Sequence, residues 1–97
     1  MYRLLIVDDE HHIVDWLYEL FQENNEMELD IFKAYTAKSA LRILERQRID
    51  VVLSDIRMPG MDGFELADVI LKNWPGSQVI FLTGYDEFDY VYRANQM

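Results

Sequence analysis

Four short runs of apolar residues recur along the chain, each bounded by charged or turn-forming residues. They cover residues 2–7, 27–35, 50–55 and 78–82. The runs at 2–7 and 50–55 show little polar alternation, which is typical of strands covered on both faces, and the run at 78–82 is also apolar. The run at 27–35 alternates in part, as a strand nearer a sheet edge does. The pattern therefore predicts four β-strands.

Between these runs, apolar residues recur at helical spacing. Helices are expected over residues 10–24, from 37 to near 48, over 63–74 and, with weaker amphipathicity, over 86–95. Thr36 suits the N-cap of the second helix, and Pro75 with Gly76 stops the third. The alternation of strands and helices, without repeats or a linker, predicts a doubly wound α/β fold with a parallel sheet and helices on both faces.

Each of the first three predicted helices carries one apolar stripe that is expected to face the sheet. The stripes consist of Ile13, Leu17, Leu20 and Phe21, flanked by Val14 and Trp16; of Ala37, Ala40, Leu41 and Leu44; and of Phe64, Ala67, Ile70, Leu71 and Trp74. The tryptophans and Phe21 are expected to pack in the core or between helices, because large aromatic side chains gain most from burial. The basic face of the second helix is expected to be solvated.

Length and composition narrow the class of protein. Ninety-seven residues allow one domain, spanning 1–97, and a hydrophobic content of 51% indicates a folded chain rather than a disordered one. A formal charge of −9 disfavours direct contact with nucleic acid or an anionic membrane. The chain has no cysteine, and the apolar run at 4–7 is too short for a signal peptide or a membrane span. A cytoplasmic location is expected.

The carboxyl ends of the predicted strands carry the candidate chemistry. Asp8 and Asp9 follow the first strand, Asp55 ends the third and Thr83 follows the fourth. These ends meet at one edge of a parallel sheet. Two like charges about 4 Å apart repel by about 4 kcal/mol at an effective dielectric constant of about 20, so clustered carboxylates need a cation. Mg²⁺, which prefers oxygen ligands, is predicted there, with Asp55 as an acceptor of a phosphoryl group.

Simpler interpretations exist for some of these residues. Asp8 and Asp9 also suit a helix N-terminus, Asp55 could cap its own loop, and a threonine at a strand end often only satisfies turn amides. The adjacent histidines His11 and His12 are expected to be surface residues, because consecutive helical positions point about 100° apart and no third nitrogen or sulfur ligand is evident.

Two other functions are compatible with an acidic strand-end site. A Mg²⁺-dependent phosphohydrolase with an aspartyl nucleophile commonly has a second aspartate two residues after the first, but that position after Asp9 is His11. An interaction module that binds a flavin phosphate would need amide or hydroxyl donors after the first strand, where this chain has three acids. Both alternatives therefore fit less well than a phosphorylated switch.

The sequence resembles the receiver domain of two-component response regulators. The resemblance runs through the whole chain and is carried by the stretches LLIVDDE, SDIRMPGMDGFEL and VIFLTGYDEF. It implies a flavodoxin-like (CheY-like) sheet with strand order 2-1-3-4, and a signalling switch that catalyses only its own phosphotransfer and slow dephosphorylation. Asp55 would accept a phosphoryl group from a sensor histidine kinase. Mg²⁺ would be bound by Asp9, Asp55 and the Arg57 backbone carbonyl directly and by Asp8 through water, and Thr83 would reorient toward the phosphoryl group.

The resemblance also implies elements beyond this sequence. Family members continue into a fifth strand, which ends in a lysine that pairs with the phosphoryl group, and a fifth helix; an incomplete, N-terminal receiver fragment is therefore expected. Lys72 falls on the third helix, where a solvated role is expected instead. The GYDEFDY segment is most similar to receivers of the YesN type, whose DNA binding resides in a following AraC-like region. An uncovered fourth strand would favour self-association of the fragment.

Overall fold

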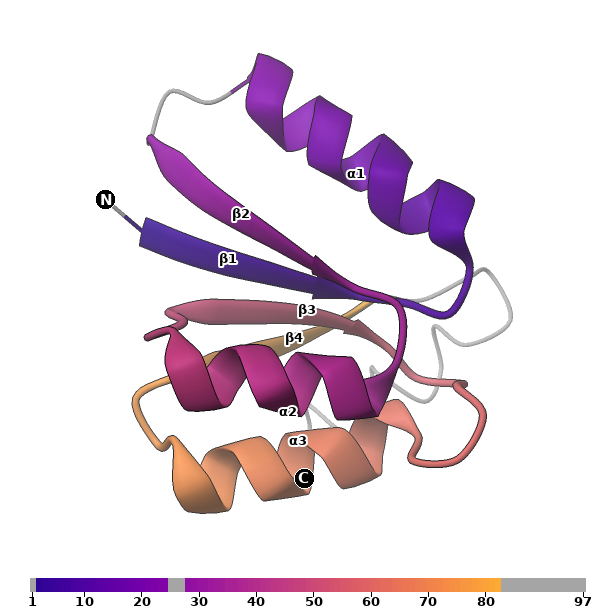
Figure 1. The fold of residues 1–97 in the computed structure, drawn as a ribbon, viewed down its shortest axis with the longest axis vertical. Helices are drawn as coiled ribbons and strands as arrows, with labels where there is room; N and C mark the ends of the chain where they lie inside the picture. Colours follow the sequence, from indigo (N-terminus) through magenta and orange to yellow (C-terminus); the bar gives the residue numbers. More distant parts are fainter. Residues whose placement is uncertain (1, 25–27, 83–97) are drawn as a thin grey trace.

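The computed structural model describes residues 2–24 and 28–82 of the chain. Its elements are β1 (Tyr2–Val7), α1 (His11–Glu23), β2 (Leu29–Ala34), α2 (Ala37–Arg46), β3 (Val51–Asp55), α3 (Gly63–Asn73) and β4 (Gln78–Leu82). The strands form one parallel sheet in the order β2-β1-β3-β4. Figure 1 shows α1 on one face of the sheet and α2 with α3 on the other. The predicted fold and strand order are confirmed.

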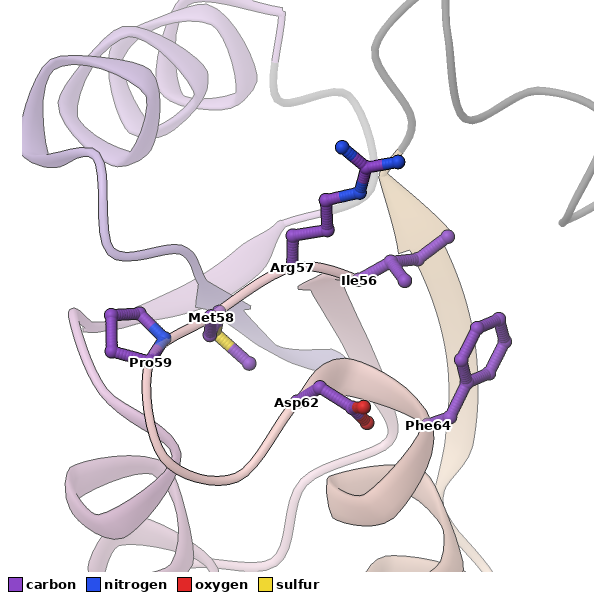
Figure 2. Close-up of a pocket in the computed structure, with 6 residues that line it drawn as sticks. All are labelled: Ile56, Arg57, Met58, Pro59, Asp62 and Phe64. Atoms are coloured by element: carbon purple, nitrogen blue, oxygen red, sulfur yellow. The ribbon is translucent and has the colours of Figure 1, made fainter.

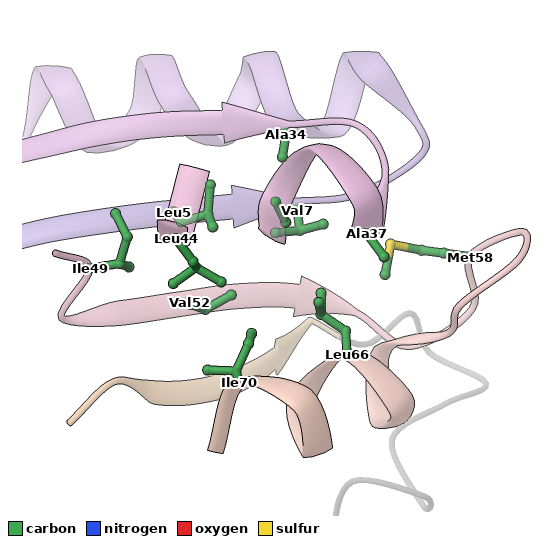
Figure 3. Close-up of a cluster of buried hydrophobic side chains, with 11 residues drawn as sticks. Leu5, Val7, Ala34, Ala37, Leu44, Ile49, Val52, Met58, Leu66 and Ile70 are labelled. Atoms are coloured by element: carbon green, nitrogen blue, oxygen red, sulfur yellow. The ribbon is translucent and has the colours of Figure 1, made fainter. Parts of the chain in front are cut away.

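The central strands are apolar on both faces because both faces are covered. Leu4, Leu5, Ile6 and Val7 of β1 are all buried, and they alternate between two core clusters. Leu5 and Val7 belong to the cluster beneath α2 and α3, which is drawn in Figure 3, whereas Leu4 and Ile6 belong to the cluster beneath α1. The sheet therefore lies between two hydrophobic layers.

Two helices begin with a capping box, in which the cap and the third helical residue satisfy each other's backbone amides. The Thr36 hydroxyl accepts the Ser39 backbone N–H (3.0 Å), which confirms the predicted cap of α2. The Asp62 carboxylate accepts the Glu65 N–H (2.8 Å), and the Glu65 carboxylate accepts the Asp62 N–H (3.3 Å) at the start of α3. Helix α2 ends at Arg46, two residues before the predicted end near Arg48.

The predicted stripe of α3 was partly wrong. Leu66 is fully buried although the stripe omitted it, whereas Leu71 is 52% exposed. The face that packs on the sheet consists of Gly63, Leu66, Ala67 and Ile70, and a residue next to Ile70 is turned about 100° away from that face. As predicted, Phe21 and Trp74 pack at the margins of the core, and the ring of Phe64 contacts the ring of Phe81 on β4.

The prediction of which side chains of α1 face the core was also partly wrong. Trp16 is 58% exposed, so it is not a core residue, and Leu20 is exposed as well. Val14 is the fully buried residue of this helix, and Tyr18 packs beside Leu17 against the α1 cluster. His11 and His12 are exposed, as predicted.

Three further predictions concern the last helix, self-association and membrane spans. The predicted helix over 86–95 lies outside the described residues. Ile80 of β4 is 51% exposed, but self-association stays a prediction. Within the described ranges, no helix is long and apolar enough to span a membrane.

Candidate functional site

Three carboxylates meet where β1 and β3 end. Asp8 and Asp9 follow β1, Asp55 is the last residue of β3, and the two parallel strands are neighbours with Val7 opposite Ser54. One oxygen from each of the three aspartates lies within 4.8 Å of the others. The structure thus brings together the three acidic residues that the sequence placed at this edge of the sheet.

The three carboxylates differ in their exposure to solvent. Asp8 is buried (5% exposed), Asp55 is partly buried and Asp9 is exposed. Burial raises the pKa of the Asp8 carboxyl, and the neighbouring Asp9 adds to this rise. The Glu10 backbone N–H donates to an Asp8 carboxylate oxygen (3.0 Å), and this contact opposes the rise in pKa. Asp8 is therefore a carboxylate that gains from a nearby cation.

The donor set fits a hard divalent cation. Three carboxylate oxygens suit Mg²⁺ in both ligand type and charge, and a set of this size leaves coordination positions for water or a phosphoryl oxygen. The exposed Asp9 and the partly buried Asp55 can be reached from solvent, whereas Asp8 lies behind them in the strand end.

Backbone contacts hold the two strand ends in place. The Asp8 N–H donates to the carbonyl oxygen of Ala34 (3.2 Å), which ties the end of β1 to the end of β2. The Gly63 N–H donates to the Ile56 carbonyl oxygen (2.7 Å), which closes the loop between β3 and α3. Met58 of this loop is buried in the core beneath α2 and α3 (Figure 3), so the loop is anchored by packing as well.

An open pocket of about 510 Å³ lies along the loop from β3 to α3, which begins directly after Asp55. Its lining consists of Ile56, Arg57, Met58, Pro59, Asp62 and Phe64. Figure 2 shows the exposed Arg57 side chain directed away from Asp62. The predicted role of the Arg57 backbone carbonyl as a metal ligand stays a prediction. Thr83 lies outside the described residues, so its role stays a prediction too.

A second polar cluster, which the sequence pattern did not predict, joins the start of α1 to the end of β2. His11 stacks on Tyr35, and Tyr35 donates a hydrogen bond to Asp15. Because Asp15 and Tyr35 are 20 residues apart, only the packing of α1 beside β2 brings them together. A local pattern of residues carries no signal for this contact.

Comparison with known proteins places this geometry in a family. The family model described as the response regulator receiver domain matches residues 4–97. The chain belongs to this family. As a receiver domain, it is a phosphorylation-dependent signal receiver of the two-component type.

Individual relatives agree with this assignment. The receiver domain is 37% identical over 94 residues to the heme response regulator HssR of Staphylococcus aureus, covering 97% of this chain and 40% of HssR. It thus spans less than half the length of that relative. A solved two component transcriptional regulator AraC from Clostridium phytofermentans has a TM-score of 0.82 and 38% identity, with 97% of this chain and 73% of that chain covered.

A third relative was solved with a ligand. The response regulator protein TrrA of Thermotoga maritima, in complex with Mg(2+)-BeF, has a TM-score of 0.81 and 36% identity, and 93% of this chain and 76% of that chain are covered.

Proposed function

We propose that Asp55 accepts a phosphoryl group from a sensor histidine kinase, with Mg²⁺ held by Asp9, Asp55 and the Arg57 backbone carbonyl and by Asp8 through water. The observation that carries this proposal is the convergence of three carboxylates within 4.8 Å at the carboxyl ends of β1 and β3. The complex of the relative TrrA with Mg(2+)-BeF supports the choice of metal.

The chemistry assigned to Asp55 is nucleophilic substitution at phosphorus. A carboxylate oxygen of Asp55 forms a bond to the phosphorus of a phosphohistidine, and the P–N bond breaks with its electron pair passing to the imidazole nitrogen. Bound Mg²⁺ supplies charge neutralisation for the phosphoryl oxygens. Asp8 and Asp9 hold negative charge at the turn after β1, and Thr83 is the predicted hydroxyl donor to the phosphoryl group.

The wider role follows from the family. We infer that the domain catalyses only its own phosphotransfer and a slow dephosphorylation, in the cytoplasm, and that it controls an attached output. The resemblance of the GYDEFDY segment to YesN-type receivers and the likeness to a two component transcriptional regulator AraC favour a DNA-binding output region. A net charge of −9 argues that this domain itself does not bind DNA.

Incubation with acetyl phosphate and Mg²⁺, followed by intact mass spectrometry, tests the proposal. Wild-type protein should gain one phosphoryl group, with a yield that saturates with Mg²⁺. Asp55→Asn should gain none, and Asp9→Asn should require more Mg²⁺ because it lacks one anionic ligand. Asp68→Asn, at an exposed position of α3, is the matched control and should behave as wild type. Equal yields in the wild type and Asp55→Asn would exclude Asp55 as the acceptor.

A further inference from the structure

A cluster of side chains joins the start of α1 to the end of β2. The rings of His11 and Tyr35 are stacked, with centroids 3.9 Å apart and an interplanar angle of 29°. The Tyr35 hydroxyl donates a hydrogen bond to Asp15 Oδ1 (2.9 Å), and Lys33 Nζ donates to the same oxygen (3.2 Å). Lys33 Nζ also lies 4.7 Å from the centre of the Tyr18 ring. Tyr35 therefore contacts α1 at two positions one helical turn apart.

These contacts flank the turn that carries two of the three carboxylates. Asp8 is tied through its N–H to Ala34 (3.2 Å), the residue before Tyr35. His11, the first residue of α1, comes two residues after Asp9 and is held by the stack on Tyr35. The turn from Asp8 to His11 is thus fastened at both of its ends to adjacent residues of the chain leaving β2.

In the part of the chain that the structure describes, the first turn of helix α1 lacks a side-chain cap. Its N-cap residue is Glu10, and within the described residues no side chain forms a capping hydrogen bond there, in contrast to α2 and α3. An uncapped first turn is free to shift relative to the sheet unless a tertiary contact holds it. The buried Val14 side chain holds this turn against the sheet. The stack of His11 on Tyr35 and the hydrogen bond from Tyr35 to Asp15 add a second tertiary contact.

Tyr35 is partly buried against the core beneath α1, but the polar contacts that it makes lie at the surface, which argues against a mainly stabilising role for those contacts. Asp15 is exposed, and contacts between exposed polar side chains typically contribute only about 0.2–1 kcal/mol to stability. The hydrogen bond from Tyr35 and the ion pair with Lys33 lower the pKa of Asp15. Small displacements of a ligand group have large effects on coordination, so the cluster can matter more for the site than for folding.

We propose that Tyr35 is a positioning residue that holds the turn from Asp8 to His11, and through it Asp9, in register with Asp55. The inference rests on the proposed function, because it assumes that this turn binds Mg²⁺. Tyr35 itself does not contact the metal or the phosphoryl group in this account. It acts through the backbone of α1.

A titration of the purified domain with Mg²⁺, followed by NMR of the Asp9 and Glu10 amides, tests the inference. Substitution of a residue that contacts a metal ligand typically weakens metal binding about 10–100-fold. Tyr35 does not contact a ligand side chain directly, so its effect should be smaller. Tyr35→Leu should raise the Kd for Mg²⁺ about threefold to tenfold. Tyr35→Phe keeps the ring stack but loses the hydrogen bond to Asp15, so its Kd should rise about twofold. The rate of phosphorylation at saturating Mg²⁺ should stay close to that of wild type in both variants.

Tyr2→Leu is the matched control. Tyr2 is also exposed (54%) but lies at the start of β1, at the end of the strand far from Asp8 and Asp9, so this variant should keep the wild-type Kd. A wild-type Kd in Tyr35→Leu, or an equal change in Tyr2→Leu, would overturn the positioning role while leaving the proposed function intact.

Other outcomes separate the two proposals. If wild-type protein shows no saturable Mg²⁺ binding, or if Asp9→Asn keeps the wild-type Kd, both the proposed function and the positioning role are overturned. If Tyr35→Leu does not fold, Tyr35→Phe and Asp15→Ala carry the test. Tyr35→Phe removes only the hydrogen bond to Asp15, and Asp15→Ala removes that acceptor together with its ion pair to Lys33. An unchanged Kd in both of those variants would also overturn the positioning role.

Discussion

Gly63 lies directly against the backbone of Asp55. An ideal Cβ built at Gly63 would be 2.2 Å from the Asp55 carbonyl oxygen and 2.9 Å from Cα of Ile56. Both neighbours are backbone atoms, so they cannot turn aside as a flexible side chain would. The first turn of α3 and the end of β3 therefore form one tightly packed unit, and the position of the candidate phosphoacceptor depends on the absence of a side chain at residue 63.

The contact predicts a large effect of one methyl group at Gly63. Gly63→Ala should destabilise the domain by about 1–3 kcal/mol, because overpacking forces the backbone to shift. It should also lower the rate of phosphorylation, since that shift moves Asp55. Urea unfolding and acetyl phosphate labelling measure the two effects. Gly76→Ala is the control, because a Cβ there meets nothing within 4 Å, and its stability should stay within about 0.5 kcal/mol of wild type. Equal stabilities of the two variants would contradict the packing argument.

Asp8 should be a source of instability in metal-free protein. Its burial and its proximity to Asp9 raise the free energy of the charged form. In the presence of a chelator at neutral pH, Asp8→Asn should therefore raise the free energy of unfolding, by on the order of 1 kcal/mol. The same variant should gain less stability than wild type when Mg²⁺ is added, which thermal unfolding with and without Mg²⁺ would show. A metal-free Asp8→Asn protein that is less stable than wild type would contradict this prediction.

Asp50 should make the domain less stable as the pH is lowered. The Arg3 backbone N–H donates to its carboxylate (2.8 Å) and lowers the pKa of Asp50 below 3.8, with a further contribution from Arg48. When the pKa of a group is lower in the folded state than in the unfolded state, the group stabilises the fold at pH values above its unfolded-state pKa. This stabilisation is lost as the pH falls through the folded-state pKa. Asp50→Asn should thus be less stable than wild type at neutral pH, and the difference should shrink below about pH 4.

Urea unfolding at a series of pH values measures this difference. Asp68→Asn, at an exposed position on α3, is the control for removing a charge without these contacts. A stability difference between Asp50→Asn and wild type that stays constant down to about pH 2 would show that the hydrogen bond from Arg3 does not depend on the charge of Asp50.

Two leucines of α3 should respond very differently to truncation. Leu66 is fully buried in the cluster beneath α2 and α3, so Leu66→Ala should cost about 2–5 kcal/mol of stability. Leu71 is 52% exposed, and Leu71→Ala should change stability by no more than about 0.5 kcal/mol. Denaturant unfolding of both variants measures this contrast, and similar losses would mean that α3 is rotated about its axis relative to the structure.

The same two residues show why the strands could be predicted more accurately than the helix faces. The central strands are buried on both sides, so an unbroken apolar run such as residues 4–7 is sufficient to identify them. A helix exposes one side, and in α3 two overlapping sets of apolar residues fit the helical period. The close contact of Gly63 with the backbone of Asp55 selects the set that contains Leu66, and that contact is tertiary.

The residues of the candidate site also differ in how well the sequence predicts them. Asp8, Asp9 and Asp55 could be predicted because each lies at the carboxyl end of a strand, and parallel strands bring these ends together. Tyr35 and Asp15 could not, because their contact depends on how α1 rotates against β2. That rotation also leaves Trp16 exposed, against the expectation for a large aromatic residue.

The most direct test of the central claim is to locate the phosphoryl group chemically. Wild-type protein is labelled with acetyl phosphate and Mg²⁺, reduced with borohydride, which converts an aspartyl phosphate to homoserine, and sequenced by tandem mass spectrometry. We expect homoserine at position 55 in an amount that rises with Mg²⁺, and none at Asp8 or Asp9. Homoserine at Asp8 or Asp9 with position 55 unmodified, or labelling that is the same with and without Mg²⁺, would contradict the claim.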